Sequence, residues 1–304
     1  MVSLVERLNV LMKLDRVVYI AIDYLKENDN LKISSIGVQD VASQSSSIFS
    51  TTSSSSTSTI TESWRERICE WSYQVVDHFD FSREVVGLSL SFLDRFLGNQ
   101  RVDKQLFQLL AMTTLYLAIK LNEPGKLSMK SMVELSRGFF TVEDMTNMEL
   151  TVLQVLSWRV NPPTPYCFSK HLLSLLHIYG NQVDRVHLNS VMELSRFLTE
   201  LSVIDYYFVT ISASSVALAS ILNAMHILHL DDIQAEFRNQ LRILDNFNPD
   251  CDEVNASRSR LGELFLQSGH YWSHLSTSSD MDRSDTESPI CVTKYSAGIQ
   301  IPKA

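Results

Sequence analysis

The residues most able to do chemistry in this sequence are charged side chains that interrupt apolar segments. Asp94 lies beside the apolar ridge Leu88, Phe92 and Phe96, so it cannot be fully solvated if this segment packs as a helix. Arg65, in the earlier segment WRERICEW, carries a guanidinium that can satisfy a buried carboxylate with two hydrogen bonds. Arg65 and Asp94 are therefore predicted to form a structural ion pair between two helices.

A second pair of charges allows two interpretations. Lys120 ends an apolar segment, where a cation complements the dipole of a helix C-terminus and reaches solvent easily. Glu149 interrupts the apolar stripe Met145, Leu153 and Leu156, which places a carboxylate on a face expected to be apolar. The residues alone are compatible with an ion pair within the chain, with simple exposure, or with binding to a partner.

Other reactive side chains do not form a recognisable catalytic or metal-binding pattern. The sequence has no glycine-rich phosphate loop, no HExxH and no GxSxG motif. The four cysteines are far apart, without CxxC spacing, and His226 and His229 have no third ligand positioned beside them. We therefore expect a protein that is not an enzyme and that needs no metal or other cofactor.

Composition narrows the class of partner. The chain has 304 residues, 45% of them hydrophobic, and a formal net charge of −9. An acidic chain without clustered basic residues is a poor nucleic-acid binder, so no nucleic-acid partner is expected.

Residues 1–30 are apolar at helical spacing but are interrupted by charges, which predicts an N-terminal amphipathic helix rather than a membrane span. No membrane association is expected.

The elements that must position these charges are helices. Residues 31–61 form a Ser/Thr-rich tract that is predicted to be a disordered linker, and residues 271–304 are predicted to be a disordered tail. Between them helical periodicity continues with almost no strand-like alternation. Residues 62–160 divide into five helices before the proline-rich segment NPPTP, and residues 161–270 repeat the pattern loosely, with Ala219 falling where Ala118 falls. The third helix, near 103–123, is apolar on nearly every face and should lie inside a ring of the others.

Four segments carry a family resemblance: WRERICEW, LDRFL, LFQLLAMTTLYLAIKLNE and MELTVLQVLSWRVNPPTPYCF. In order and at matching distances, they resemble the cyclin box of A-, B- and D-type cyclins. The resemblance covers about residues 64–168 and continues more weakly to about residue 268. It implies an all-α fold of two tandem five-helix cyclin repeats.

The resemblance also implies a partner and the residues that bind it. Lys120 and Glu149 match the lysine and glutamate with which cyclins hydrogen-bond to a cyclin-dependent kinase near its mobile αC helix. The apolar wall against which that helix packs is matched by Leu117, Leu121, Leu153, Trp158 and Val160. Arg65 and Asp94 match the internal ion pair of the family.

A further family surface is altered in this sequence. Cyclins that recruit substrates or inhibitors with RxL motifs use a shallow apolar patch, matched here by Trp64, Arg67, Ile68, Trp71, Gln74, Phe107 and Gln108. Trp64 replaces a methionine, and Arg67 places a charge where an aliphatic side chain belongs. The patch is therefore a degraded form of the family's docking surface.

The function that the resemblance implies is regulatory. We expect a subunit that binds and activates a cyclin-dependent serine/threonine kinase by holding its αC helix in the active position, and thereby controls cell-cycle progression in the nucleus and cytoplasm. One alternative is a degenerate cyclin-fold scaffold that binds a kinase without activating it. Another is a transcription factor of the same fold, which is disfavoured because the sequence shows no zinc ribbon and no basic stripe.

Overall fold

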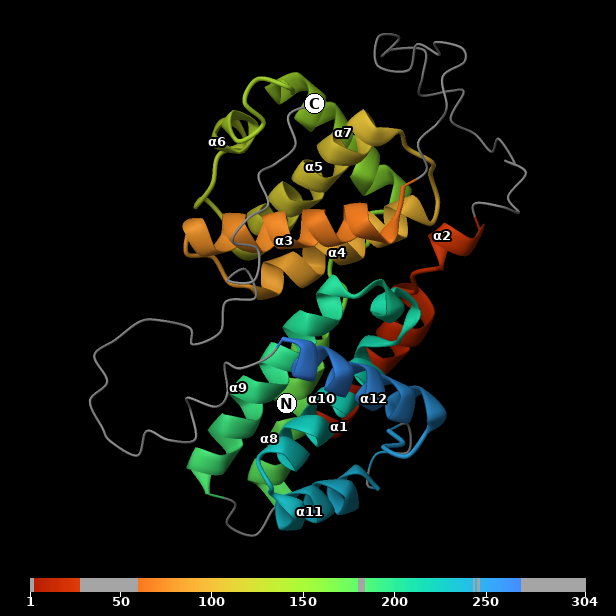
Figure 1. The fold of residues 1–304 in the computed structure, drawn as a ribbon, viewed down its shortest axis with the longest axis vertical. Helices are drawn as coiled ribbons and strands as arrows, with labels where there is room; N and C mark the ends of the chain where they lie inside the picture. The colour runs from red at the N-terminus through yellow and green to blue at the C-terminus, as the bar shows by residue number, and fades with distance from the viewer. Residues whose placement is uncertain (1–2, 28–59, 180–183, 243, 245–246, 269–304) are drawn as a thin grey trace.

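The computed structural model describes residues 3–27, 60–179, 184–242, 244 and 247–268. In this part of the chain the regular elements are all helical, and they form two helical bundles stacked end to end (Figure 1). Most of the predicted linker at 31–61, the tail at 271–304 and the end of the second predicted repeat lie outside the described residues. Ile60 is described, and it is buried in the core of the first bundle.

The first bundle has five helices, α3 (Glu62–His78), α4 (Glu84–Leu97), α5 (Lys104–Asn122), α6 (Met129–Glu134) and α7 (Val142–Val155). Helix α5 is the central one, because every residue from Leu109 to Ile119 is buried. It packs against α4 and α7. A helix that is apolar on all sides has to be surrounded, and this is the arrangement predicted from the sequence.

The second bundle repeats this plan with α8 (Pro165–Tyr179), α9 (Arg185–Ile204), α10 (Ala213–Ile227), α11 (Asp231–Leu241) and α12 (Asp252–Gln267). A short 3-10 helix, η2 (Tyr206–Thr210), joins α9 to α10. Helix α10 is buried from Ser214 to Met225 and takes the central place of α5. Ala118 and Ala219, which the loose repeat matches, are both fully buried in these central helices. The prediction of two tandem five-helix repeats is confirmed.

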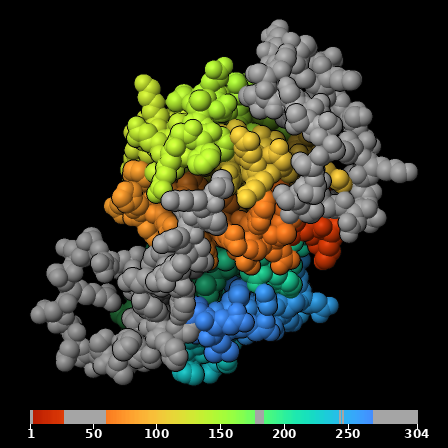
Figure 2. Space-filling model, turned by 45° about the horizontal axis from the view of Figure 1, so that its top comes forward, coloured from red at the N-terminus to blue at the C-terminus, as the bar shows by residue number. Residues whose placement is uncertain are grey.

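The N-terminal segment differs from the single helix predicted for residues 1–30. Helix α1 (Leu4–Lys13) gives way to one π-helical turn, η1 (Leu14–Val18), then to extended chain and the short helix α2 (Tyr24–Glu27). The first part packs on the second bundle through Leu8 and Met12, whereas Tyr24 is buried in the core of the first. Figure 2 shows this red segment emerging at the junction of the two bundles. One straight helix could not reach both cores, so the chain unwinds between them.

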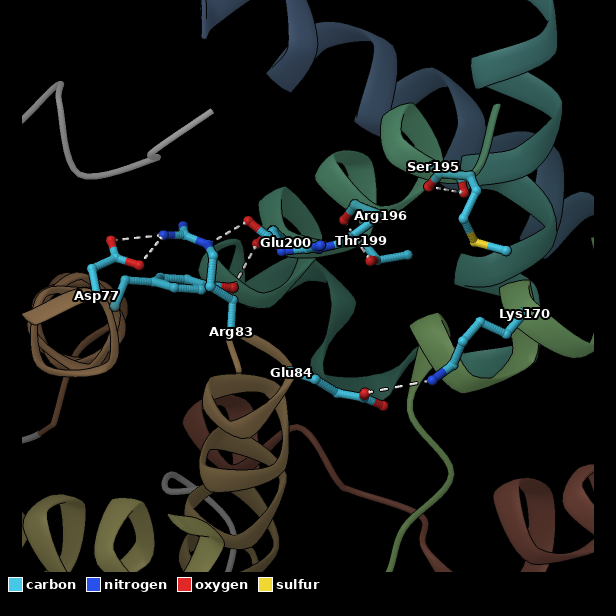
Figure 3. A network of polar contacts seen from close by, with 10 residues as sticks. Asp77, Arg83, Glu84, Lys170, Ser195, Arg196, Thr199 and Glu200 are labelled. Carbon is cyan, nitrogen blue, oxygen red and sulfur yellow. Dashed lines mark hydrogen bonds and ion pairs between the residues drawn. The ribbon is translucent and has the colours of Figure 1, made fainter. Parts of the chain in front are cut away.

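Buried charges also hold the two bundles together (Figure 3). Arg83, just before α4, binds both carboxylate oxygens of Asp77 through Nη1 at 2.6 and 2.7 Å, and Glu200 of α9 through Nε at 2.8 Å. Arg196 donates to the other oxygen of Glu200 at 3.2 Å. Burial raises the pKa of Glu200 even though two arginines face it. The network therefore helps to fix the position of α9 against the first bundle.

Candidate protein-binding face

Lys120 and Glu149 lie together on the surface of the first bundle. Lys120 is in the last turn of α5, and its Nζ is 2.9 Å from Oε1 of Glu149 on α7. The Lys120 side chain is 52% exposed, whereas that of Glu149 is 10% exposed. The hydrogen bond to Glu149 raises the pKa of Lys120, so the lysine is cationic at neutral pH. The intrachain pair is present, and it leaves the ammonium group accessible from outside.

Helix capping fixes where this pair lies. The Asp103 side chain accepts a hydrogen bond from the backbone N–H of Leu106 at 2.8 Å and starts α5. Thr141 and Asp144 form a capping box at the start of α7, as their spacing predicts. Because a helix repeats every 3.6 residues, a fixed first residue sets the direction of each later side chain. The caps therefore set which face of each helix carries Lys120 or Glu149, and the packing of α5 against α7 brings the two side chains together.

The apolar residues predicted to surround the pair fall into three groups. Leu121 and Trp158 are 46% and 64% exposed. Leu153 and Val160 are half-buried at the edge of the first core. Leu117 is only 2% exposed and lies within the core. The expected contact of Leu117 with a partner is therefore corrected, because this side chain supports the face from beneath.

Two residues of this face were missed in the sequence. Val142 and Leu150, on α7, are 39% and 48% exposed. At 100° per residue, Val142, Glu149 and Leu153 project within about 40° of one another around α7, and Leu150 lies about 60° further round, next to Leu153. Their helical spacing relative to Glu149 was the available signal. We define the α5/α7 face as Lys120, Leu121, Val142, Glu149, Leu150, Leu153, Trp158 and Val160.

Trp158 reaches the α5/α7 face from an unusual backbone. Ser157 and Trp158 have φ angles of +51° and +61°, in the left-handed region that residues with side chains seldom adopt. Such backbone strain costs of order 1–3 kcal/mol per residue and needs support from the surroundings. One source of support is Arg95, whose Nη2 donates to the carbonyl oxygen of Arg159 at 2.7 Å.

The predicted docking patch is only partly a surface. Arg67, Gln74 and Gln108 are exposed, and Trp64, Ile68 and Trp71 are half-buried. Phe107 is 2% exposed, with the Trp64 ring 5.9 Å from it. The expected accessibility of Phe107 is therefore corrected, because the larger Trp64 side chain lies against it in the place of a methionine.

The predicted ion pair between Arg65 and Asp94 is present and buried. Nε and Nη2 of Arg65 bind the two carboxylate oxygens at 2.9 and 2.8 Å. Burial alone would lower the pKa of Arg65, but the Asp94 carboxylate raises it above its ordinary value. Nη1 of Arg65 also donates to the carbonyl oxygens of Val203 and Ile204, at 2.8 and 3.1 Å. The pair therefore joins helices of the first bundle to the end of α9.

The structure offers little support for other kinds of site. Within the described ranges no group of three or more potential ligands is arranged around a metal position, and the pair His226 and His229 gains no third ligand. None of the described helices combines the length and apolar character needed to span a membrane.

Comparison with known proteins gives a consistent result. Residues 38–161 match the family model of the cyclin N-terminal domain, and residues 163–251 match that of the cyclin C-terminal domain. The chain is 30% identical over 165 residues to Cyclin-B2-1 of Arabidopsis thaliana, covering 54% of this chain and 36% of that protein. It is 28% identical over 165 residues to G2/mitotic-specific cyclin-1 of Medicago sativa subsp. varia, again covering 54% and 36%.

A solved structure shares the fold at lower identity. A chain of the yeast RNA Pol II CTD kinase CTDK-1 complex aligns with a TM-score of 0.50 and 15% identity, over 79% of each chain. The matched region spans about a third of the length of the two curated relatives. The two family models cover the first bundle and the second bundle as far as residue 251, which leaves α12 outside them. On this evidence the chain belongs to the cyclin family.

Proposed function

We propose that this cyclin is a regulatory subunit that binds a cyclin-dependent serine/threonine kinase and activates it by holding the kinase αC helix in the active position. One observation carries the proposal: a half-exposed lysine, Lys120, paired with Glu149 on a face that also exposes Leu121, Leu150 and Trp158. Family membership supports it, and the structural likeness is to a chain of a kinase complex.

The α5/α7 face has the chemistry that such a helix needs. An ammonium group has three hydrogen-bond donors, and Glu149 uses one of those on Lys120, which leaves two for carbonyl oxygens of a partner. Leu121, Leu150 and Trp158 supply exposed apolar surface around it. Aromatic anchors in the middle of an interface contribute most of its binding energy. The Lys120–Glu149 pair sets the position of the partner helix along the face. A backbone carbonyl of that helix that is buried without a hydrogen-bond partner costs about 1–3 kcal/mol.

Activation follows if the two kinase states are bound unequally. A kinase is active when its β3 lysine pairs with the glutamate of αC, so a partner that binds only that arrangement shifts the population toward it. A shift from about 1:99 to about 99:1 requires roughly 5.5 kcal/mol of differential affinity. An interface of about 1,600 Å² with a few buried anchors can provide that difference.

Control of cell-cycle progression is the wider role that we propose. A relative with 28% identity is named a G2/mitotic-specific cyclin, which supports this role. The nucleus and cytoplasm are the compartments where such a regulator would act. A degenerate scaffold that binds the kinase without activating it is the alternative, and the experiment below separates the two.

The proposal is tested by affinity capture from synchronised cells, with the bound kinase identified and its activity measured. The double variant Lys120→Ala, Glu149→Ala should remain folded but lose the kinase. The control variant, Arg238→Ala with Asp250→Ala, removes a surface ion pair of the second bundle and should capture the kinase normally. Full capture and activation by the double variant would refute the proposal. Normal capture of an inactive kinase by the parent would favour the scaffold.

A further inference from the structure

Arg95 is a buried charge that pairs with no carboxylate of the described residues. The residue is 6% exposed, and none of the ion pairs found among the described residues includes it. Its Nε is buried and has no hydrogen-bond partner in the described part of the chain, and burial lowers the pKa of Arg95 to about 10. Burying a charge without a counter-ion costs several kcal/mol. The presence of an arginine at this position is therefore not explained by a contribution to the stability of the fold.

Two aromatic rings supply part of the missing stabilisation. The guanidinium carbon of Arg95 is 5.0 Å from the ring centroid of Tyr19 and 5.8 Å from that of Phe92. Contacts of this kind contribute about 0.5–2 kcal/mol, with the larger values in desolvated places. Phe92 lies one turn before Arg95 on α4, whereas Tyr19 comes from the N-terminal segment. The N-terminal segment thus completes the environment of Arg95.

Tyr19 is held in place from both sides along the chain. Before it, the Asp15 carboxylate accepts hydrogen bonds of 3.0 Å from the backbone N–H groups of Ala213 and Ser214, at the start of α10. After it, the Tyr24 hydroxyl donates to Asp94 in the first bundle. With both neighbours fixed to different bundles, the short chain between them has little freedom to move Tyr19 away from Arg95.

Arg95, which contacts Tyr19, also reaches the backbone beside the α5/α7 face. Nη2 of Arg95 donates to the carbonyl oxygen of Arg159 at 2.7 Å, and Arg159 directly follows Trp158. Trp158 has a φ of +61°, and its side chain is 64% exposed. A strained backbone that displays an exposed aromatic side chain has to be held by its neighbours. The hydrogen bond from Arg95 is such a constraint.

We infer that Tyr19 and Arg95 are positioning residues, which hold the backbone of Arg159 so that Trp158 projects from the α5/α7 face in a form ready to bind. The contact links the N-terminal segment to the face that Trp158 occupies. Its effect on kinase affinity rests on the proposed function, whereas its effect on the backbone of residues 157–160 does not.

The backbone effect is measured on the full isolated chain by amide hydrogen exchange. Tyr19→Leu should accelerate exchange at Arg159 and Val160 by roughly two- to thirtyfold, the range that corresponds to loss of the ring contact. Exchange in the central helix α10 should stay unchanged. Tyr19→Phe keeps the ring and should behave like the parent, as should Val17→Ala, which alters an exposed residue of the same segment. Unchanged exchange at residues 159 and 160, or equal acceleration throughout the chain, would overturn the inference.

The effect on binding is measured as a double-mutant cycle with the cyclin-dependent kinase that the chain captures. Tyr19→Leu should weaken binding by roughly five- to tenfold in the parent, but less than twofold in a Trp158→Ala background. Equal weakening in both backgrounds would show that Tyr19 does not act through Trp158. If Trp158→Ala alone leaves binding unchanged, the proposed binding face is wrong, while the exchange result still decides the positioning role.

Discussion

The hydroxyl of Tyr24 donates a hydrogen bond of 3.0 Å to the same Asp94 carboxylate that Arg65 binds with two. The ring of Tyr24 lies edge-on to Tyr206, 5.3 Å away, and Tyr206 in turn donates to Asp23 at 3.0 Å. Through Tyr24 and Arg65, one buried carboxylate therefore links the N-terminal segment and the first bundle to the end of α9 and to η2 in the second bundle. The ion pair that the sequence predicted between two helices is the centre of a larger joint.

Asp94→Ala should destabilise the protein strongly, because it leaves Arg65 charged and buried. Removing one partner of a buried pair costs about 3–5 kcal/mol. For a domain of this size, each kcal/mol lowers the melting temperature by roughly 2–4 °C. Thermal unfolding followed by circular dichroism measures the shift. The exposed control Asp232→Ala should change it little, and an Asp94→Ala variant that melts like the parent would exclude the structural role.

Tyr24→Phe should loosen the N-terminal segment without unfolding the bundles. It removes a single hydrogen bond to a charged group, worth about 1.5–3 kcal/mol, and keeps the ring against Tyr206. Limited proteolysis should therefore cut the variant faster within residues 14–27, whereas the core of each bundle stays resistant. Equal cleavage rates in variant and parent would show that apolar contacts alone hold the segment.

The ion-pair network of Glu200 should make stability depend on pH. Burial raises the pKa of Glu200 above its ordinary value of 4.5. In the pH range from 4.5 up to the raised pKa, the Glu200 carboxyl is therefore protonated more in the native state than in the unfolded chain. More protons bound in the native state means that stability from this group is present at low pH and is lost as pH rises through the window.

Glu200→Gln removes this titration. In urea unfolding between pH 4.5 and 7.5, the free energy of unfolding of the parent minus that of the variant should be largest at the lowest pH and decrease as pH rises. An increase of this difference with pH would mean that Arg83 and Arg196 outweigh burial. Glutamine has nearly the same shape as glutamate, so the substitution removes the charge with little change in packing.

Arg67→Ile should restore apolar character to the altered docking patch. An exposed guanidinium there has to be desolvated when the leucine of an RxL motif binds beside it, whereas an aliphatic side chain gains about 1–2 kcal/mol from burial. The affinity for a synthetic RxL peptide should therefore increase by roughly five- to thirtyfold, as measured by fluorescence polarisation. Arg185→Ile, an exposed change on the second bundle, should have no effect. If Arg67→Ile binds no better, the shape set by Trp64 and Phe107 is the obstacle.

Local sequence determined the five helices of the first bundle and the central place of α5, whereas it predicted the second bundle only as a loose repeat. Their apolar periodicity, the capping box at Thr141 and the all-round apolar character of α5 are short-range signals, which do not depend on the rest of the fold. The same reasoning predicted the pair between Arg65 and Asp94, because a carboxylate on an apolar ridge leaves few alternatives. An ion pair between Lys120 and Glu149 was one of the interpretations that the residues left open, and the family resemblance assigned both residues to kinase binding.

Tertiary structure decided the course of the N-terminal segment, the burial of individual side chains and the contacts between distant parts of the sequence. Residues 1–30 are apolar at helical spacing, yet the chain leaves the helix after Lys13 because its two ends pack on different bundles. Leu117 and Phe107 were predicted at surfaces but are buried, since exposure depends on which neighbours cover a side chain. The contacts of Arg95 with Tyr19 and Arg159 join three distant parts of the sequence, and only the packing of those parts brings them together.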